Sequence, residues 1–527
     1  SREIVFKMDE KYEVVISGIG GTFPESDNVE ELKKNLFAKL NLVTLDDRRW
    51  KRGDLEVPAA VGKISNMGRF DTTFFGIHKK LCKDLDDLTK QSIERSYEAI
   101  IDAGFNPMEL HGSNTAVLMA STISESEFTT IFDTKESQGF GILGHNRAMQ
   151  ANRISYMLNL TGQSINLDCN WTGGMQVLEM AKNMISDGHA RAALVGVAHL
   201  VRHPTISLQF MGLGVLNSGD KVKSFSGDAD GYNRSEAIVV LFLQRAEDAR
   251  RCYASLINVK ILNFGNRSTF FEQNTHESFK NLLNETYSEA DIDPSSISFL
   301  EADGTACPKI DALELNIVDE VLCRNRKTPL LIGSVKSNLG HTEASASLVS
   351  VVKALIALDT GRIPPNLHYS TPNPDVPALL SGKLKVVTEE LPLLGDIVGV
   401  NAIGLCGSYG HVILRKNKKL MKKKTDPLKI LPRLVFLSGR EVEGVENMIK
   451  QMEEMALDEE FIALMHKVFL PNTIQHMVRS YVILPKLESS ICEVQSSSRS
   501  KELPVWFVFS GMGSQWAGMG KQLLEIP

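Results

Sequence analysis

The sequence predicts an α/β protein in which strands separated by helices build βαβ units around buried sheets. Short runs of β-branched and apolar residues alternate with longer stretches of helical periodicity, and the two halves of this series look alike. The runs expected to be strands are 13–18, 116–120, 165–168, 193–197, 237–242, 255–261, 298–301, 330–335, 398–402 and 412–415. Helical periodicity is clearest over 88–103, 174–187 and 349–358.

Composition excludes several classes of protein. The 527 residues are 43% hydrophobic and 23% charged, as in ordinary globular proteins, which allows one large domain and a smaller one. A net charge of −6 gives no indication of nucleic-acid or membrane binding, and no run of apolar residues is long enough to span a bilayer. Seven scattered cysteines without a CxxC pair favour reduced thiols, a cytoplasmic location and no metal site.

Changes in composition suggest the domain boundaries. Residues 1–11 are expected to be an N-terminal leader, without a signal-peptide core, ahead of a large domain at 12–414. The basic run 415–424 (RKNKKLMKKK) lacks aromatic residues and amphipathic order, so we interpret it as a solvated connection rather than a site for an anionic partner. It opens a small α/β linker domain at 415–502, with strands at 433–439 and 480–485 around a helix at 442–455. A further strand and glycine loop begin in the last segment, 503–527.

Several ordered motifs carry a resemblance to a known family. They are DDRRW at 46–50, MGRFDTTFFGIH at 67–78, ANRIS at 151–155, GYNRSE at 231–236 and IGSVKSNLGH at 332–341. Together they resemble the β-ketoacyl synthase, or condensing, region of animal-type fatty acid synthases. The resemblance implies a thiolase-like fold of five layers, α-β-α-β-α, and a homodimer. The segment 505–520 resembles the opening of an acyltransferase domain, but the serine nucleophile elbow of that domain is absent.

The residues that the family uses for condensation are substituted here. Its nucleophile is a cysteine at the start of a helix, where the helix dipole favours the thiolate. Aligned without gaps, this position is Trp171, and an indole cannot accept an acyl group. Cys169 lies two residues earlier, several ångströms away by strand geometry (~6–7 Å), and we interpret it as a small buried thiol.

The first of the family's two histidines corresponds to Asp303, followed by the substrate-binding Thr305. A carboxylate here would repel a malonyl carboxylate or a forming enolate, unless it is protonated or paired with Lys336. Of these alternatives we favour a structural salt bridge to Lys336. The nearby Cys307 is expected to be an inert core thiol.

The second histidine and the ordering lysine of the family are retained as His341 and Lys336. Both phenylalanines that line and gate the acyl pocket in the family are replaced, by Ile403 and Leu405. The region implies no cofactor of its own, although the phosphopantetheine arm of an acyl carrier protein would deliver substrate to an active enzyme. The partners expected are a second copy, a carrier protein or further synthase domains.

Three functions remain open at this point. The substitutions favour a pseudo-condensing domain that serves as a dimeric scaffold or acyl-binding module. The chain could instead be an active component of a fatty acid synthase that uses unexpected residues for acyl transfer and decarboxylative condensation. Decarboxylation without condensation is a third reading, against which Asp303 argues.

Overall fold

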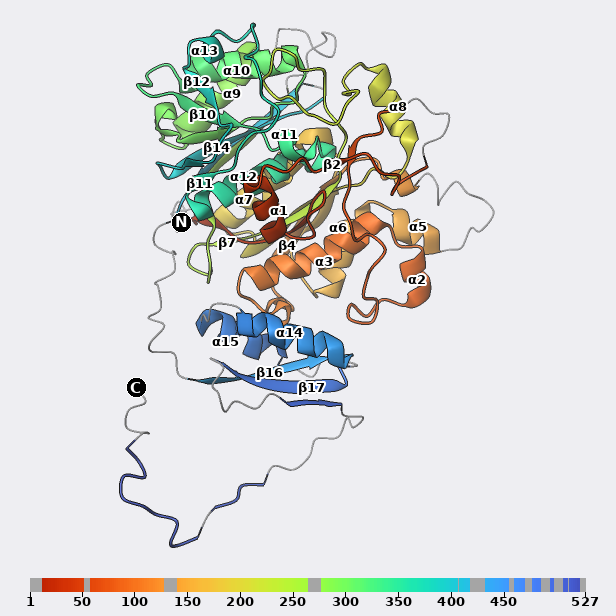
Figure 1. Ribbon diagram of the computed structural model, residues 1–527, viewed down its shortest axis with the longest axis vertical. Coiled ribbons are helices and arrows are strands. Elements are labelled where there is room, and N and C mark those ends of the chain that lie inside the picture. Colours follow the sequence, from red (N-terminus) through yellow and green to blue (C-terminus); the bar gives the residue numbers. More distant parts are fainter. Residues whose placement is uncertain are drawn as a thin grey trace, which may run out of the picture. The chain divides into compact units, whose positions relative to one another are not determined.

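The computed structural model describes residues 12–51, 57–127, 140–263, 276–405, 407–417, 432–454, 459–469, 476–484, 493–496, 506–509 and 511–521. The chain forms two compact units, Ser1–Lys424 and Thr425–Pro527, each of which is described by itself (Figure 1). None of the helices described is long and apolar enough to cross a membrane.

The first unit contains an 11-stranded mixed sheet, ordered β12-β10-β9-β14-β15-β8-β1-β7-β6-β4-β5. Its strands are β1 (Val14–Thr22), β4 (Thr115–Ser121), β5 (Ser164–Leu167), β6 (Ala192–His199), β7 (Ala237–Arg245), β8 (Ala254–Asn263), β9 (Phe299–Glu301), β10 (Leu330–Gly333), β12 (Leu384–Val386), β14 (Ile397–Ile403) and β15 (Ser408–Arg415). Two-stranded pairs join β2 (Val43–Thr44) to β3 (Val61–Gly62) and β11 (Arg362–Ile363) to β13 (Leu391–Pro392).

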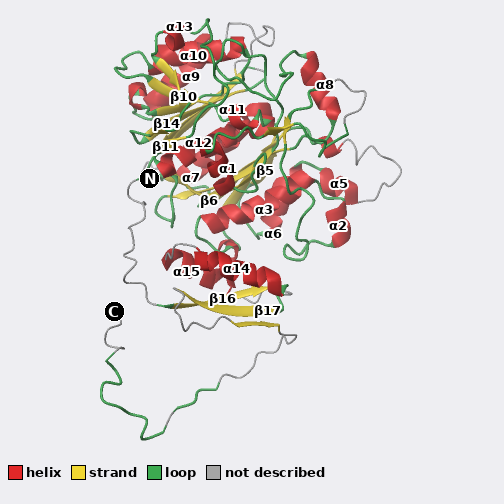
Figure 2. Ribbon diagram, in the orientation of Figure 1, coloured by secondary structure: helices red, strands yellow, loops and turns green. Residues whose placement is uncertain are grey.

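Helices cover both faces of this sheet and also fill the space between its two halves (Figure 2). Helices α7 and α12 pack on each other and on strands of both halves, whereas α3 and α6 cover one outer face and α9 the other. This arrangement confirms the predicted layering of helices and strands. The helices are α1 (Val29–Phe37), α2 (Lys79–Lys83), α3 (Asp87–Asp102), α5 (Phe140–His145), α6 (Ala148–Met157), α7 (Gly173–Ser186), α8 (Pro204–Gly212), α9 (His276–Glu289), α10 (Pro308–Leu322), α11 (Lys336–Leu339), α12 (Ala346–Thr360) and α13 (Pro377–Leu380).

Glycines set the distances between these layers. A Cβ atom at Gly18 of β1 would lie 2.0 Å from the Ala99 carbonyl oxygen of α3, so only glycine lets helix and strand approach this closely. Likewise, a Cβ atom at Gly174 would lie 2.3 Å from Ser347 Oγ, at the contact of α7 with α12. The start of α7 is thereby held against the inner layer, beside Trp171.

All ten runs predicted as strands in the first unit are strands, with ends shifted by a few residues. The run 330–335 stops at Gly333, because the chain turns there into α11. The run 349–358 is the second part of α12, whose buried face begins earlier, at Ala346.

The second unit holds an antiparallel sheet of β16 (Arg433–Gly439), β17 (Val478–Leu484) and β18 (Glu493–Ser496). Helices α14 (Val442–Glu454) and α15 (Glu459–Phe469) share a small hydrophobic core with this sheet. The predicted strands and helix of the linker domain are therefore present. Residues 506–509 and 511–521 are described without a helix or strand.

Candidate active site

Trp171 occupies a short 3-10 turn, Asn170–Thr172, between the end of β5 and the start of α7. Its side chain is 5% exposed and sits inside an aromatic cluster. The ring centroid lies 4.3 Å from that of His341, 5.7 Å from Tyr232 and 6.1 Å from Phe210. The indole therefore fills the place where the resemblance puts a nucleophile.

Neither nearby cysteine is arranged to replace that nucleophile. Cys169 precedes the 3-10 turn and is half-buried rather than fully buried as expected, and burial together with Asp168 raises the pKa of its thiol. Burial, with Asp311 nearby, raises the pKa of the Cys307 thiol to about 12. A thiol with a raised pKa holds little thiolate near neutral pH, which makes it a poor nucleophile.

Asp303 forms the buried salt bridge expected from the sequence. Its Oδ1 atom lies 2.9 Å from Lys336 Nζ, and both side chains are 4% exposed or less. Lys336 Nζ also donates to the Asp303 carbonyl oxygen at 2.7 Å, and Asp303 Oδ1 accepts from the Ile403 amide at 3.2 Å. Among the residues described, Asp303 Oδ2 has no hydrogen-bond partner although it is buried. The Lys336 ammonium thus forms both an ion pair and a hydrogen bond with the same residue, Asp303.

Two acidic residues of α10, Asp311 and Glu314, accept hydrogen bonds from the segment 303–305. Neither was identified from the sequence. Glu314 accepts hydrogen bonds from the amides of Asp303 (2.8 Å) and Gly304 (3.0 Å) and from Asn401 Nδ2 (2.8 Å). Burial and the charge of Asp303 raise the pKa of Glu314 to about 7. Asp311 accepts from Thr305 Oγ1 at 3.1 Å. No helix was predicted from the sequence over 308–322, and the signal would have been two acidic residues three apart among the apolar residues of that segment.

His341 is fully buried and faces the indole. Its Nδ1 accepts from the Glu343 amide at 2.9 Å, and in the part of the chain described its Nε2 has no hydrogen-bond partner. Burial, followed by the charges of Lys336 and His199, lowers the pKa of His341 well below its usual value. The imidazole is consequently neutral with its proton on Nε2, one donor without an acceptor.

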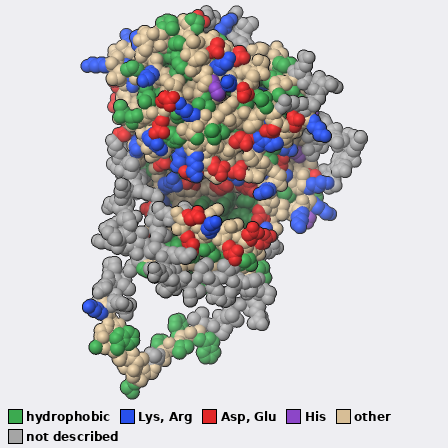
Figure 3. Space-filling model, in the orientation of Figure 1, with side chains coloured by type: hydrophobic (Ala, Val, Ile, Leu, Met, Phe, Trp, Pro, Cys, Tyr) green, Lys and Arg blue, Asp and Glu red, His purple; other side chains and the backbone are tan. Residues whose placement is uncertain are grey.

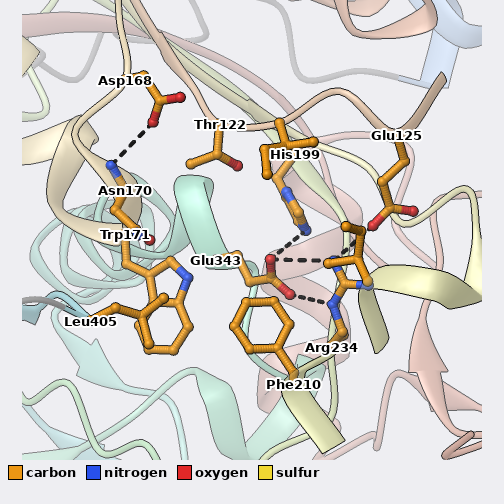
Figure 4. A pocket seen from close by; sticks show the side chains of 12 residues that line it. Thr122, Glu125, Asp168, Asn170, Trp171, His199, Phe210, Arg234, Glu343 and Leu405 are labelled. Atoms are coloured by element: carbon orange, nitrogen blue, oxygen red, sulfur yellow. Dashed lines mark hydrogen bonds and ion pairs between the residues drawn. The ribbon is translucent and has the colours of Figure 1, made fainter. Parts of the chain in front are cut away.

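The remaining predicted residues divide between the pocket and the core. Leu405 lines a cavity of about 220 Å³ next to Trp171, whereas Ile403 is buried in a hydrophobic cluster that also contains Phe225 and Tyr409. Thr305 is not among the residues that line this cavity, and its hydroxyl donates to Asp311. The cavity is lined by Thr122, Ile123, Glu125, Asp168, Asn170, Trp171, His199, Ile206, Phe210, Arg234, Glu343 and Leu405 (Figure 4).

A buried ionic cluster at one side of the cavity was also missed. Arg234 pairs with Glu125 at 2.8 Å and with Glu343, and donates to Ser207 Oγ at 3.0 Å. His199 Nε2 lies 3.3 Å from Glu343 Oε2. Arg234 belongs to the GYNRSE motif and Glu343 follows His341 by two residues, so the motifs located the cluster without revealing that its members meet.

Comparison with known proteins identifies the family. Residues 11–249 match the β-ketoacyl synthase N-terminal domain, residues 253–370 its C-terminal domain, and residues 372–483 the ketoacyl-synthetase C-terminal extension. A fatty acid synthase of Anser anser anser is 37% identical over 353 residues, covering 66% of this chain and 99% of that sequence. The chain belongs to the β-ketoacyl synthase family.

Polyketide synthases are related to this ketosynthase chain as well. The highly reducing polyketide synthase of Sordaria araneosa is 28% identical over 87% of this chain, which spans only 16% of that much longer protein.

Solved ketosynthases share the fold. An oxazolomycin ketosynthase domain of Streptomyces albus aligns with a TM-score of 0.80 at 22% identity, covering 90% of this chain and 85% of that one. The ketosynthase from module 1 of the bacillaene synthase of Bacillus amyloliquefaciens aligns with a TM-score of 0.78 at 22% identity, covering 93% and 92%. The predicted thiolase-like fold is confirmed.

Proposed function

We propose that this ketosynthase region does not condense acyl and malonyl groups and acts instead as a dimeric scaffold within a fatty acid synthase-like protein. The observation that carries the proposal is the packing of Trp171 against His341, with ring centroids 4.3 Å apart, at the nucleophile position. An indole has no group that can form a thioester, so covalent catalysis has no starting point here.

The environment of Asp303 supports the same conclusion. Its carboxylate, paired with Lys336, stands where the family places a hydrogen-bond donor for the developing enolate. Losing one such donor typically costs ~10²–10³ in rate, and a negative charge in its place adds electrostatic repulsion. The retained His341 supplies a single donor, which favours neither condensation nor decarboxylation.

The small volume of the cavity also favours the function of a scaffold rather than that of an acyl-binding module. Its volume of about 220 Å³ is below the roughly 300–1,000 Å³ of typical small-molecule sites. Trp171 therefore leaves room for a small group rather than for a long acyl chain. A carrier protein or other synthase domains are proposed to contact the outer surface of this chain. No acyl group is transferred to the chain in that contact.

A homodimer is part of the proposal. Strand β5 ends the 11-stranded sheet, and all four of its residues are only half-buried. A free edge strand offers unpaired backbone groups, which a second copy related by twofold symmetry can complete. On the face drawn in Figure 3, by contrast, lysine and arginine are interspersed with aspartate and glutamate on the first unit, which fits a solvated surface.

Intact-mass measurement after incubation with acyl and malonyl thioesters tests the proposal. We expect the mass of the chain to remain unchanged and no carbon dioxide to be released. An acyl adduct on a cysteine would show an active enzyme that uses another nucleophile, and carbon dioxide release without an adduct would show a decarboxylase. Either result would overturn the proposed function.

A further inference from the structure

A chain of buried hydrogen bonds leads from α9 toward the loop 303–307, which joins β9 to α10. It begins at Tyr287 of α9, whose hydroxyl oxygen lies 2.8 Å from His411 Nε2. The other ring nitrogen, His411 Nδ1, lies 2.7 Å from Asn401 Oδ1, directly across the pair of β14 and β15. Asn401 Nδ2 donates in turn to Glu314 of α10 at 2.8 Å. All four side chains are 1% exposed or less, so the chain of hydrogen bonds is shielded from water.

The loop 303–307 adopts a backbone conformation that needs support. Gly304 has a φ of 52° and Ala306 a φ of 61°, and this left-handed region is unfavourable for an alanine although not for a glycine. The amides of Asp303 and Gly304 both donate to Glu314, at 2.8 and 3.0 Å. Contacts from outside the loop, rather than local preference, therefore hold its conformation.

The donors and acceptors of this chain can be assigned in one direction. Above its pKa of about 7, Glu314 is a carboxylate that only accepts, so Asn401 directs its NH₂ group to Glu314 and its oxygen to His411. Facing an acceptor, Nδ1 of His411 must carry a proton. Burial lowers the pKa of His411 to about 3, so the ring is neutral and its Nε2 accepts. The hydroxyl of Tyr287, which burial keeps protonated by raising its pKa, is then the donor to Nε2.

From these contacts, the structure assigns three positioning residues to the loop 303–307, which act on it through Glu314. They are Tyr287, His411 and Asn401, with His411 as the Nδ1–H tautomer. Each of them donates toward Glu314, which fixes the carboxylate on the sheet side while its oxygens hold the loop amides on the other. The assignment goes beyond the proposed function, because it concerns how the loop is held and applies whether or not the chain condenses.

Nitrogen NMR on the full chain with labelled histidines tests the tautomer. At about pH 8, above the pKa of Glu314, we expect His411 to carry its proton on Nδ1 and none on Nε2, the reverse of His341. Tyr287→Phe removes only the hydroxyl that donates to Nε2, so it should shift that signal and thereby identify His411. A protonated Nε2 on His411, or no histidine signal that responds to Tyr287→Phe, would overturn the assignment.

Hydrogen exchange tests whether this chain holds the loop. In Tyr287→Phe we expect the amides of the loop 303–307 to exchange ~3–10-fold faster, the effect of losing one hydrogen bond. Tyr253→Phe is the matched control, because it removes a hydroxyl that donates to Asp102 at 2.9 Å, in another part of the sheet. Unchanged exchange of the loop in Tyr287→Phe, or equal acceleration in both variants, would overturn the positioning role. Neither experiment uses a thioester, so its failure is distinct from failure of the proposed function.

Discussion

The indole of Trp171 and the imidazole of His341 lie with their ring centroids 4.3 Å apart, tilted by 51°. The contact joins the position of the missing nucleophile to the one family histidine that is retained. It also keeps His341 buried and neutral, since the ring that covers it offers neither water nor a counter-ion. On the proposed function, the residue that replaces the nucleophile therefore also covers the retained histidine.

Trp171 should contribute strongly to stability. Replacing it with alanine empties a packed aromatic site, and we expect the free energy of unfolding to fall by ~3–5 kcal/mol. Tyr156→Ala is the control, because Tyr156 is 87% exposed and its loss should change stability by less than ~0.5 kcal/mol. Denaturant titration measures both values. If Trp171→Ala lowered the free energy of unfolding as little as Tyr156→Ala does, the indole would not be packed as described.

The pairing of Asp303 with Lys336 predicts a large cost when only one partner is removed. Asp303→Asn leaves the buried ammonium of Lys336 without a counter-charge, so we expect a loss of ~3–5 kcal/mol in the free energy of unfolding. Combining it with Lys336→Met should recover part of that loss. The exposed pair of Lys383 with Asp319 is the control, and Asp319→Asn should cost less than ~1 kcal/mol. Equal costs at the two sites would refute a buried salt bridge.

Glu314 should make stability depend on pH in a defined direction. Its pKa is raised from 4.5 to about 7 in the folded protein, by burial and then by the charge of Asp303. The folded state therefore binds this proton more tightly, and the stabilisation is complete below pH 4.5 and is lost as the pH rises through 7. Glu314→Gln should accordingly lower the free energy of unfolding most at low pH. The difference from the parent chain should become smaller as the pH rises toward 7.

Glu320 serves as a control, because its pKa is shifted in the opposite direction to that of Glu314. The side-chain hydrogen bond from Lys280 lowers the pKa of Glu320, so its stabilisation is present above its usual pKa and is lost as the pH falls. Glu320→Gln should therefore destabilise more at neutral pH than under acid conditions. Denaturant titrations across this range that gave parallel pH profiles for both variants and the parent would contradict the assigned pKa shifts.

The proposed dimer can be tested at the free edge of β5. The Val117 amide donates to the Gln163 carbonyl oxygen, so alternate residues of β5 face β4 and Ser164 faces outward. Ser164→Pro removes an outward donor and should yield a folded monomer, whereas the parent chain should be a dimer by light scattering at micromolar concentration. A parent chain of monomer mass would rule out the dimer.

Much of this site was predictable because its residues lie in ordered motifs. The alternation of strand runs with helical periods predicts βαβ units around buried sheets, whereas the five layers and the positions of Trp171 and Asp303 are implied by the resemblance of the motifs to the condensing family. The salt bridge to Lys336 followed from opposite charges at one site. The cluster of Glu125, His199 and Arg234 could not be predicted in the same way, because its members come from distant segments that only tertiary packing brings together.

Product formation from acyl and malonyl thioesters tests the central claim most directly, measured for the parent chain, Trp171→Cys, Asp303→His and the double variant. The parent should form no product, and each single variant should fail because the other half of the site is still missing. The double variant should show the largest recovery, because nucleophile and oxyanion donor act as a unit. Ile403 and Leu405 should still hold its rate below that of a normal synthase. Condensation by the parent at ~1 s⁻¹ or more would contradict the account, since that is a rate typical of enzymes.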